Sequence, residues 1–169
     1  MHVDAILDRL TRFPAALRAA AQIPEPEDRL YTSSPADWSI IEIVTHLADE
    51  EQRDFPVRIL STLRDPSHPW PPIDPEGWAR DGAYRDRDLE TELARFESAR
   101  RTAIEAVRPW PEPDWAGVYS HPTGPLRAGD LFAAWCAHDA LHLRQIAKRL
   151  FEITQRDASG FHTKYAGDW

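Results

Sequence analysis

Hydrophobic residues recur at three- and four-residue steps along four stretches of the chain, with polar positions between them. That period is typical of amphipathic α-helices, and no stretch alternates apolar and polar residues over a length that indicates a strand. The pattern predicts four helices, over about residues 3–22, 39–63, 87–107 and 127–152, and a tail over residues 153–169. Four such helices joined by irregular connections, 64–85 and 109–126 among them, favour an all-α four-helix bundle in a single domain over residues 1–169.

Proline and capping residues mark the expected irregularities in this pattern. Ser39 and Glu42 have the spacing of a capping box, in which each side chain accepts a hydrogen bond from the other residue's backbone N–H. Pro14 in the first helix and Pro56 in the second should each kink the helix, because proline has no N–H to donate. Residues 64–85 contain five prolines and no helical period, and a connection of that length is often a lid or a dimer contact.

Two histidines lie on the apolar face of the fourth predicted helix. On a wheel of ~100° per residue, with Leu131 at zero, His138 falls near ~340° and His142 near ~20°, in the middle of the apolar stripe. On the second helix His46 flanks the stripe, and Glu50 points into it one turn later. Three imidazoles from two helices can hold a divalent ion and leave positions open for water, which is the arrangement of a catalytic metal site.

The chemistry of the donors restricts the ion but leaves an alternative open. Neutral imidazole nitrogen suits Zn, Ni, Fe or Cu far better than Mg or Ca. A histidine on an apolar face is also commonly a hydrogen-bonded core residue that binds nothing. In that case the polar cluster alone would hold the bundle together.

Arg100 lies on the inner face of the third predicted helix, between apolar residues. A guanidinium there needs a carboxylate partner or a wet cavity, because an unpaired buried charge costs several kcal/mol. Glu50 is expected either to orient a ligand of the ion or to pair with Arg100. The run from His138 to His142 also resembles the HExxH motif of zinc proteases, but Asp139 is shorter than the glutamate of that motif.

Composition narrows the class of function. A net charge of −8 disfavours a nucleic-acid or anionic-membrane partner. No apolar run approaches the ~18 residues of a membrane-spanning helix, and the first residues lack the features of a signal peptide. Cys136 is the only cysteine, so an internal disulfide and a thiolate metal site are both excluded. We therefore expect a cytoplasmic protein.

Three segments together resemble the DinB/YfiT-like superfamily, in the right order along the chain: WSIIEIVTHLADEE (38–51), FESARRTAI (96–104) and HPTGPLRAGDLFAAWCAHDALHLRQI (121–146). The resemblance implies a four-helix bundle of the up-down-down-up type. It also implies a divalent metal, commonly nickel or zinc, held by three histidines that match His46, His138 and His142. His121 falls on the family's His-Pro turn, where a structural role is implied. Members usually have Ser or Thr as a cap before the last helix, and this chain has Arg127 instead.

The resemblance implies a metal-dependent enzyme. Characterised relatives are similar to thiol-dependent transferases and isomerases or to metal-dependent hydrolases, and many are associated with stress responses. We therefore expect the ion to activate a low-molecular-weight thiol or water against a small electrophilic substrate, with Glu50 and Arg100 beside its ligands. The alternatives are a non-catalytic, stress-associated metal-binding bundle and a homodimeric small-molecule-binding scaffold with residues 64–85 as its contact surface.

Overall fold

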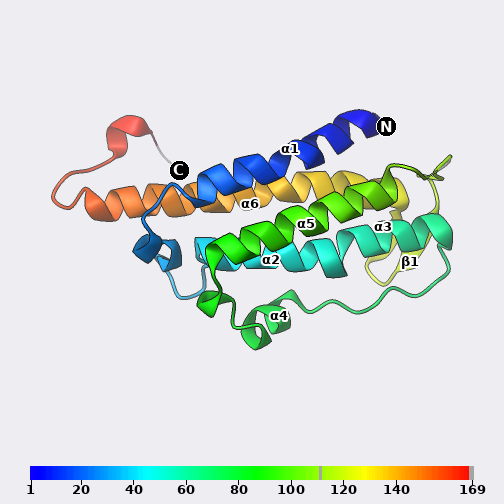
Figure 1. The fold of residues 1–169 in the computed structure, drawn as a ribbon, viewed down its shortest axis with the longest axis horizontal. Helices are drawn as coiled ribbons and strands as arrows, with labels where there is room; N and C mark the ends of the chain where they lie inside the picture. Colours follow the sequence, from blue (N-terminus) through cyan, green and yellow to red (C-terminus); the bar gives the residue numbers. More distant parts are fainter. Residues whose placement is uncertain (111, 168–169) are drawn as a thin grey trace.

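The long helices of the protein lie side by side as a four-helix bundle (Figure 1). A computed structural model describes residues 1–110 and 112–167. The long helices are α1 (Val3–Ala21), α2 (Ile40–Arg53), α3 (Phe55–Arg64), α5 (Leu89–Val107) and α6 (Ala128–Asp157). The predicted helical bundle is confirmed, and α2 and α3 together form one of its four members. None of the described helices has the length and apolar character needed to cross a membrane.

Pro56 breaks the second predicted helix instead of kinking it. The helix α2 ends at Arg53, Asp54 leaves the helical conformation at φ −123° and ψ −96°, and Pro56 lies in the first turn of α3. In a first turn the missing N–H would have had no partner in the helix, so proline is tolerated there. Pro14, in contrast, lies inside α1, which is a single helix from Val3 to Ala21.

The starts of α2 and α6 are fixed by side chains that bond back to the backbone. The predicted capping box is present: the N–H of Ser39 donates to Glu42 at 2.9 Å, and the N–H of Glu42 donates to the Ser39 hydroxyl at 3.4 Å. At α6 the backbone N–H of Arg127 donates to Asp130 at 3.0 Å, so the helix begins without a Ser or Thr cap. The helix α6 continues to Asp157, past the predicted end near residue 152.

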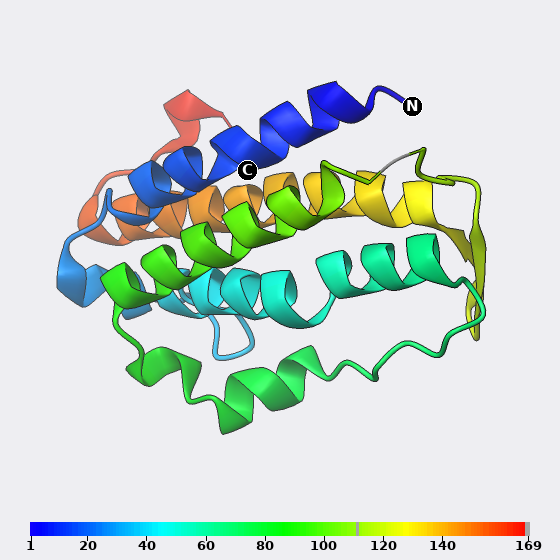
Figure 2. The same ribbon diagram turned by 45° about the vertical axis from the view of Figure 1, so that its right-hand side comes forward.

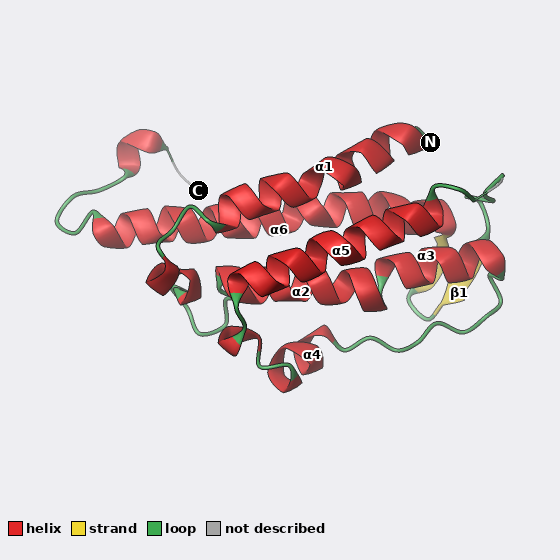
Figure 3. Cartoon of the chain, in the orientation of Figure 1, coloured by secondary structure: helices red, strands yellow, loops and turns green. Residues whose placement is uncertain are grey.

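A short antiparallel hairpin lies in the connection that the sequence predicts to be irregular, residues 109–126. It pairs β1 (Val118–His121) with β2 (Gly124–Arg127), the yellow strands of Figure 3. Gly124 has φ +129°, a conformation that favours glycine, where the chain turns back. The expectation of no strand was wrong here because four-residue strands are too short to show an alternating pattern.

The connection between α3 and α5 runs along the outside of the bundle, from the end of α3 to the start of α5 (Figure 2). It contains the helix α4 (Pro75–Asp81), which the sequence analysis missed, and a 3-10 turn at Tyr84–Asp86. Asp74 caps α4 by accepting the N–H of Gly77 at 2.9 Å. Further 3-10 turns are formed by Pro26–Leu30 and Lys164–Ala166. The last two residues of the predicted tail lie outside the described residues.

The hydrophobic core is divided into two parts by polar side chains at the middle of the bundle. One part includes Leu17, Ile43, Leu93, Phe96 and Ile146, and the other includes Leu10, Ile59, Ala103, Phe132 and Trp135. On α5, Arg100 lies between the two parts, and on α6 the same place is taken by His138 and His142. The polar residues that the sequence analysis selected therefore belong to a central layer of the bundle.

Candidate metal centre

The structure brings together the three histidines that the sequence predicts as metal ligands. One ring nitrogen of each of His46, His138 and His142 lies within 4.8 Å of the others. The Nε2 atoms of His138 and His142 are 2.9 Å apart. Nitrogens around a tetrahedral zinc ion are roughly 3.3 Å apart, since each Zn–N bond is about 2.0–2.1 Å. Small side-chain rotations would therefore give the cluster the spacing of a metal site.

Aromatic residues enclose two sides of this cluster. The ring of Trp38 lies 4.7 Å from that of His46, and the ring of Phe55 lies 4.9 Å from that of His138, both measured between centroids. His46 and His142 are buried, with 5% and 7% of their surface exposed, whereas His138 is half-buried. His138 is therefore the most exposed of the three rings.

Burial keeps all three imidazoles neutral near pH 7. Burial, followed by the charges of His142 and His138, lowers the pKa of His46 to about 2. Burial, followed by the charge of His142, lowers the pKa of His138 to about 3. The pKa of His142 is also lowered by burial. Metal ions bind the neutral form of imidazole, so the cluster is already in its ligand form at neutral pH.

Gln145 orients one of the imidazoles, a role that the sequence analysis did not assign to it. Its amide oxygen lies 2.7 Å from Nδ1 of His142, so Nδ1 carries the hydrogen and donates it. The lone pair of His142 is then on Nε2, which faces His138. A hydrogen bond of this kind to the second ring nitrogen is typical of histidines that bind metal. The sequence signal for this contact was the three-residue spacing between His142 and Gln145, which places both side chains on the same face of one helix.

Nδ1 of His46 is buried and has no hydrogen-bond partner among residues 1–110 and 112–167. The nearest carboxylate oxygen, Oε1 of Glu50, is 3.8 Å away, which is too long for a hydrogen bond. Burial, together with the charge of Asp54, raises the pKa of Glu50. The two groups are therefore both neutral near pH 7 and do not form an ion pair. His46 therefore has a buried ring nitrogen that no described residue binds, which fits a histidine available to an ion.

Arg100 pairs with Asp139 and Glu51, so the expected alternative of a pair with Glu50 was wrong. Its guanidinium donates to the two oxygens of Asp139 at 2.7 and 2.8 Å, and to Glu51 at 2.8 Å. The prediction that this buried arginine has a carboxylate partner is confirmed. Because both oxygens of Asp139 are held by Arg100, Asp139 does not take the position of the base in an HExxH motif.

His121 lies apart from the cluster, at the end of β1. Its Nδ1 accepts the backbone N–H of Thr123 at 3.3 Å and is 2.7 Å from the hydroxyl of the same residue. These contacts close the hairpin turn, which agrees with the expected structural role. Asp54, which the sequence analysis did not select, is buried next to Glu50 and binds Arg58 at 2.6 Å.

The comparisons with known proteins identify the family and the fold of the chain. The family model of the DinB superfamily matches residues 9–146. The solved structure of YfiT from Bacillus subtilis, described as a probable metal-dependent hydrolase with an unusual four-helix bundle topology, superposes with a TM-score of 0.80 at 17% identity. The match covers 90% of this chain and 87% of that one, and at this identity it shows the fold alone. The comparison with curated proteins found no match.

Proposed function

The chain belongs to the DinB superfamily, and on that basis we propose that His46, His138 and His142 hold Zn²⁺ or Ni²⁺ in a metal-dependent enzyme of the hydrolase type. The observation that carries the proposal is the approach of three buried ring nitrogens to within 4.8 Å of one another. The description of YfiT as a probable metal-dependent hydrolase supports the choice of reaction type.

The residues of the chain prepare the site in three ways. Burial keeps the imidazoles neutral, Gln145 holds the ring of His142, and Trp38 and Phe55 limit the access of water. A bound divalent ion supplies Lewis-acid chemistry, which lowers the pKa of water or of a thiol so that it becomes a nucleophile near pH 7. Glu50 carries a proton near pH 7, and its Oε1 lies 3.8 Å from Nδ1 of His46, so it is a group that can exchange a proton at the site.

The proposal also covers the substrate, the order of the helices, the location of the enzyme and its oligomeric state. A small electrophile reaches the site at the exposed edge of His138, and either water or a low-molecular-weight thiol attacks it. The helix order is up-down-down-up, supported by the return of residues 65–88 along the outside of the bundle (Figure 2). A cytoplasmic location and a homodimer are part of the same proposal, with no nucleic-acid or membrane partner.

The test is metal analysis of the chain purified without a histidine tag, together with an activity panel. We expect about one Zn or Ni per chain and metal-dependent hydrolysis of small activated esters, assayed with and without added thiols. His138→Ala should lose both, whereas His162→Ala, at an exposed position, should keep both. A protein without bound metal, in which His138→Ala changes neither activity nor stability, would refute the proposal.

A second candidate, a bundle that uses the cluster only for stability, is favoured by one observation. The two Nε2 atoms of His138 and His142 are 2.9 Å apart, so the neutral rings satisfy each other by a hydrogen bond. In this case metal removal changes the melting temperature while no ester or thiol is turned over at any metal loading. Metal-dependent turnover contradicts this candidate.

A further inference from the structure

A groove of about 580 Å³ lies between α2, α3 and α5, and none of the three histidines lines it. Most of its walls are apolar and are formed by Pro56, Val57, Leu60, Ala99, Ala103 and Ala106, while Gln52, Arg95, Ser98 and Thr102 add polar atoms to its lining. The groove owes its width to α5, where small alanine side chains face the larger residues of α3. A volume of this size accommodates a small organic molecule.

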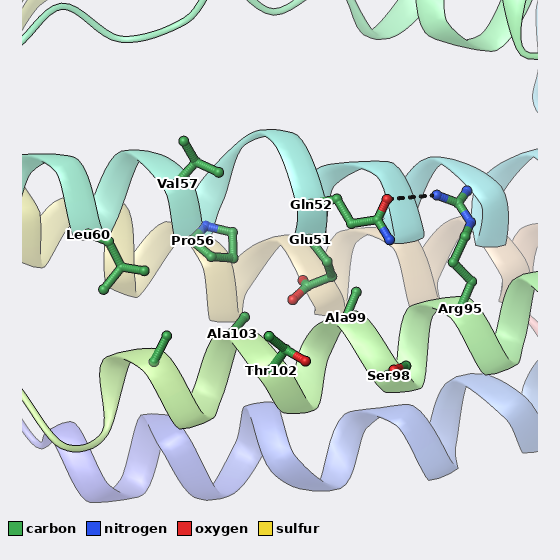
Figure 4. Close-up of a pocket in the computed structure, with 11 residues that line it drawn as sticks. Glu51, Gln52, Pro56, Val57, Leu60, Arg95, Ser98, Ala99, Thr102 and Ala103 are labelled. Atoms are coloured by element: carbon green, nitrogen blue, oxygen red, sulfur yellow. Dashed lines mark hydrogen bonds between the residues drawn. The ribbon is translucent and has the colours of Figure 1, made fainter.

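Glu51 points from α2 into the space between α2 and α5, toward Ala99 and Ala103 (Figure 4). Only 2% of its side chain is exposed. Its Oε1 accepts from the indole N–H of Trp135 at 2.6 Å and from Arg100 at 2.8 Å. Its Oε2, also buried, has no hydrogen-bond partner in the part of the chain that the structure describes. An unpaired carboxylate oxygen in such a place is costly, and a donor in the groove would relieve that cost.

The charges around the floor of the groove do not balance. The guanidinium of Arg100 is shared by two carboxylates, those of Glu51 and Asp139, which leaves one negative charge in excess. Arg95, which also lines the groove, does not offset it, because its guanidinium is bound to Asp49 and Glu92, each at 2.6 Å. The floor therefore attracts a cation with hydrogen-bond donors.

We propose that this groove binds a small organic molecule with a primary ammonium group on an apolar body. The ammonium donates to Oε2 of Glu51, and the apolar body lies against the alanines of α5. A charge-assisted hydrogen bond to a buried carboxylate is stronger than one from a neutral donor, so an amine binds in preference to an alcohol of the same shape. The proposal goes beyond the metal centre and does not depend on it.

The test uses benzylamine, protonated at pH 7, and benzyl alcohol, its neutral counterpart. Each is titrated into the full-length ¹⁵N-labelled protein, and the indole N–H resonance of Trp135 is followed, since this group donates to Glu51. Trp135→Phe identifies the resonance. We expect a saturable shift with benzylamine and at least about tenfold weaker binding of benzyl alcohol, because the alcohol lacks the charge. Equal binding of both, or no shift with either, overturns the proposal.

Ala99→Leu and its control Ala94→Leu locate the binding site without changing a charge, and Glu51→Gln tests the charge itself. Ala99→Leu fills the groove, whereas Ala94→Leu adds the same side chain at an exposed position of α5 that does not line it. Benzylamine binding should fall at least tenfold in Ala99→Leu and stay unchanged in Ala94→Leu. Glu51→Gln should weaken benzylamine and leave benzyl alcohol unaffected. Full benzylamine binding by Ala99→Leu means that the amine binds elsewhere, for example at the histidines, and overturns the proposal.

Discussion

The guanidinium of Arg100 donates a hydrogen bond to the backbone carbonyl oxygen of Leu10 at 3.1 Å. In a regular α-helix that carbonyl would accept the N–H of residue 14, and Pro14 has none. The arginine thus satisfies the carbonyl that proline leaves free, and it links α1 to α5 at the middle of the bundle. This contact accounts for the presence of a proline inside an unbroken helix.

Replacing Arg100 should destabilise the fold strongly. Arg100→Met keeps much of the volume, but it leaves Asp139 and the carbonyl of Leu10 without this donor and removes one of the two donors to Glu51. Removal of one partner from a buried ion pair costs about 3–5 kcal/mol. Urea unfolding followed by circular dichroism measures the loss. The control is Arg101→Met on the exposed side of α5, which we expect to change the free energy of unfolding by about 0.5 kcal/mol or less.

Loss of Gln145 should weaken metal binding without removing a ligand. Gln145→Ala frees Nδ1 of His142, and the loss of such an orienting hydrogen bond typically costs 10–100-fold in metal affinity. Competition with a chromophoric chelator measures the affinity. Gln145→Glu, which retains an acceptor, should keep most of it, and Arg144→Ala at the neighbouring exposed position should have no effect. Equal affinities of Gln145→Ala and the unaltered chain would contradict this role.

Removal of the metal should lower the melting temperature. A ligand that binds only the folded state stabilises it by about 2.7 kcal/mol at a free concentration of 100 times its Kd. For a chain of this size that corresponds to roughly 5–10 °C. Differential scanning calorimetry with Zn²⁺, with Ni²⁺ and after dialysis against a chelator gives the comparison. His46→Ala should melt at the same temperature under all three conditions, and a metal response in that variant would argue against the site.

Tyr84 should make the protein sensitive to alkali. Its hydroxyl donates to Asp49 at 2.5 Å, and burial, together with that carboxylate, raises the pKa of the phenol. The protonated phenol contributes fully to stability below the pKa of tyrosine in the unfolded chain, about 10. This contribution is lost as the pH rises above that value, because the phenol then ionises in the unfolded state but not in the folded one. The loss is about 1.4 kcal/mol per pH unit.

Urea unfolding at pH 8, 10 and 11 tests this effect. Tyr84→Phe should lower stability at pH 8, since Asp49 loses its donor, but the further loss between pH 10 and 11 should be smaller than in the unaltered chain. Tyr165→Phe, at a fully exposed position, should leave the pH dependence unchanged. The same alkaline loss in Tyr84→Phe would show that this phenol is not responsible.

The period of the sequence predicted the helices because amphipathic periodicity depends on local geometry alone. The capping box at Ser39 and the common face of His138 and His142 are local in the same sense, and both were visible before the fold was known. The need of Arg100 for a carboxylate could also be predicted, since it follows from the cost of a buried charge.

Which carboxylate pairs with Arg100 could not be predicted from the sequence. Glu50 and Glu51 are neighbours on α2, about 100° apart around the helix, and only the rotation of α2 against α5 and α6 decides which of them meets Arg100. The groove beside α5 and the hydrogen bond from Arg100 to the Leu10 carbonyl also depend on how the helices are placed against one another. Sequence by itself determined which faces of the helices are buried and which residues need partners. The tertiary structure decided which partners they have, because that depends on how deeply and at what angle helices distant in sequence pack together.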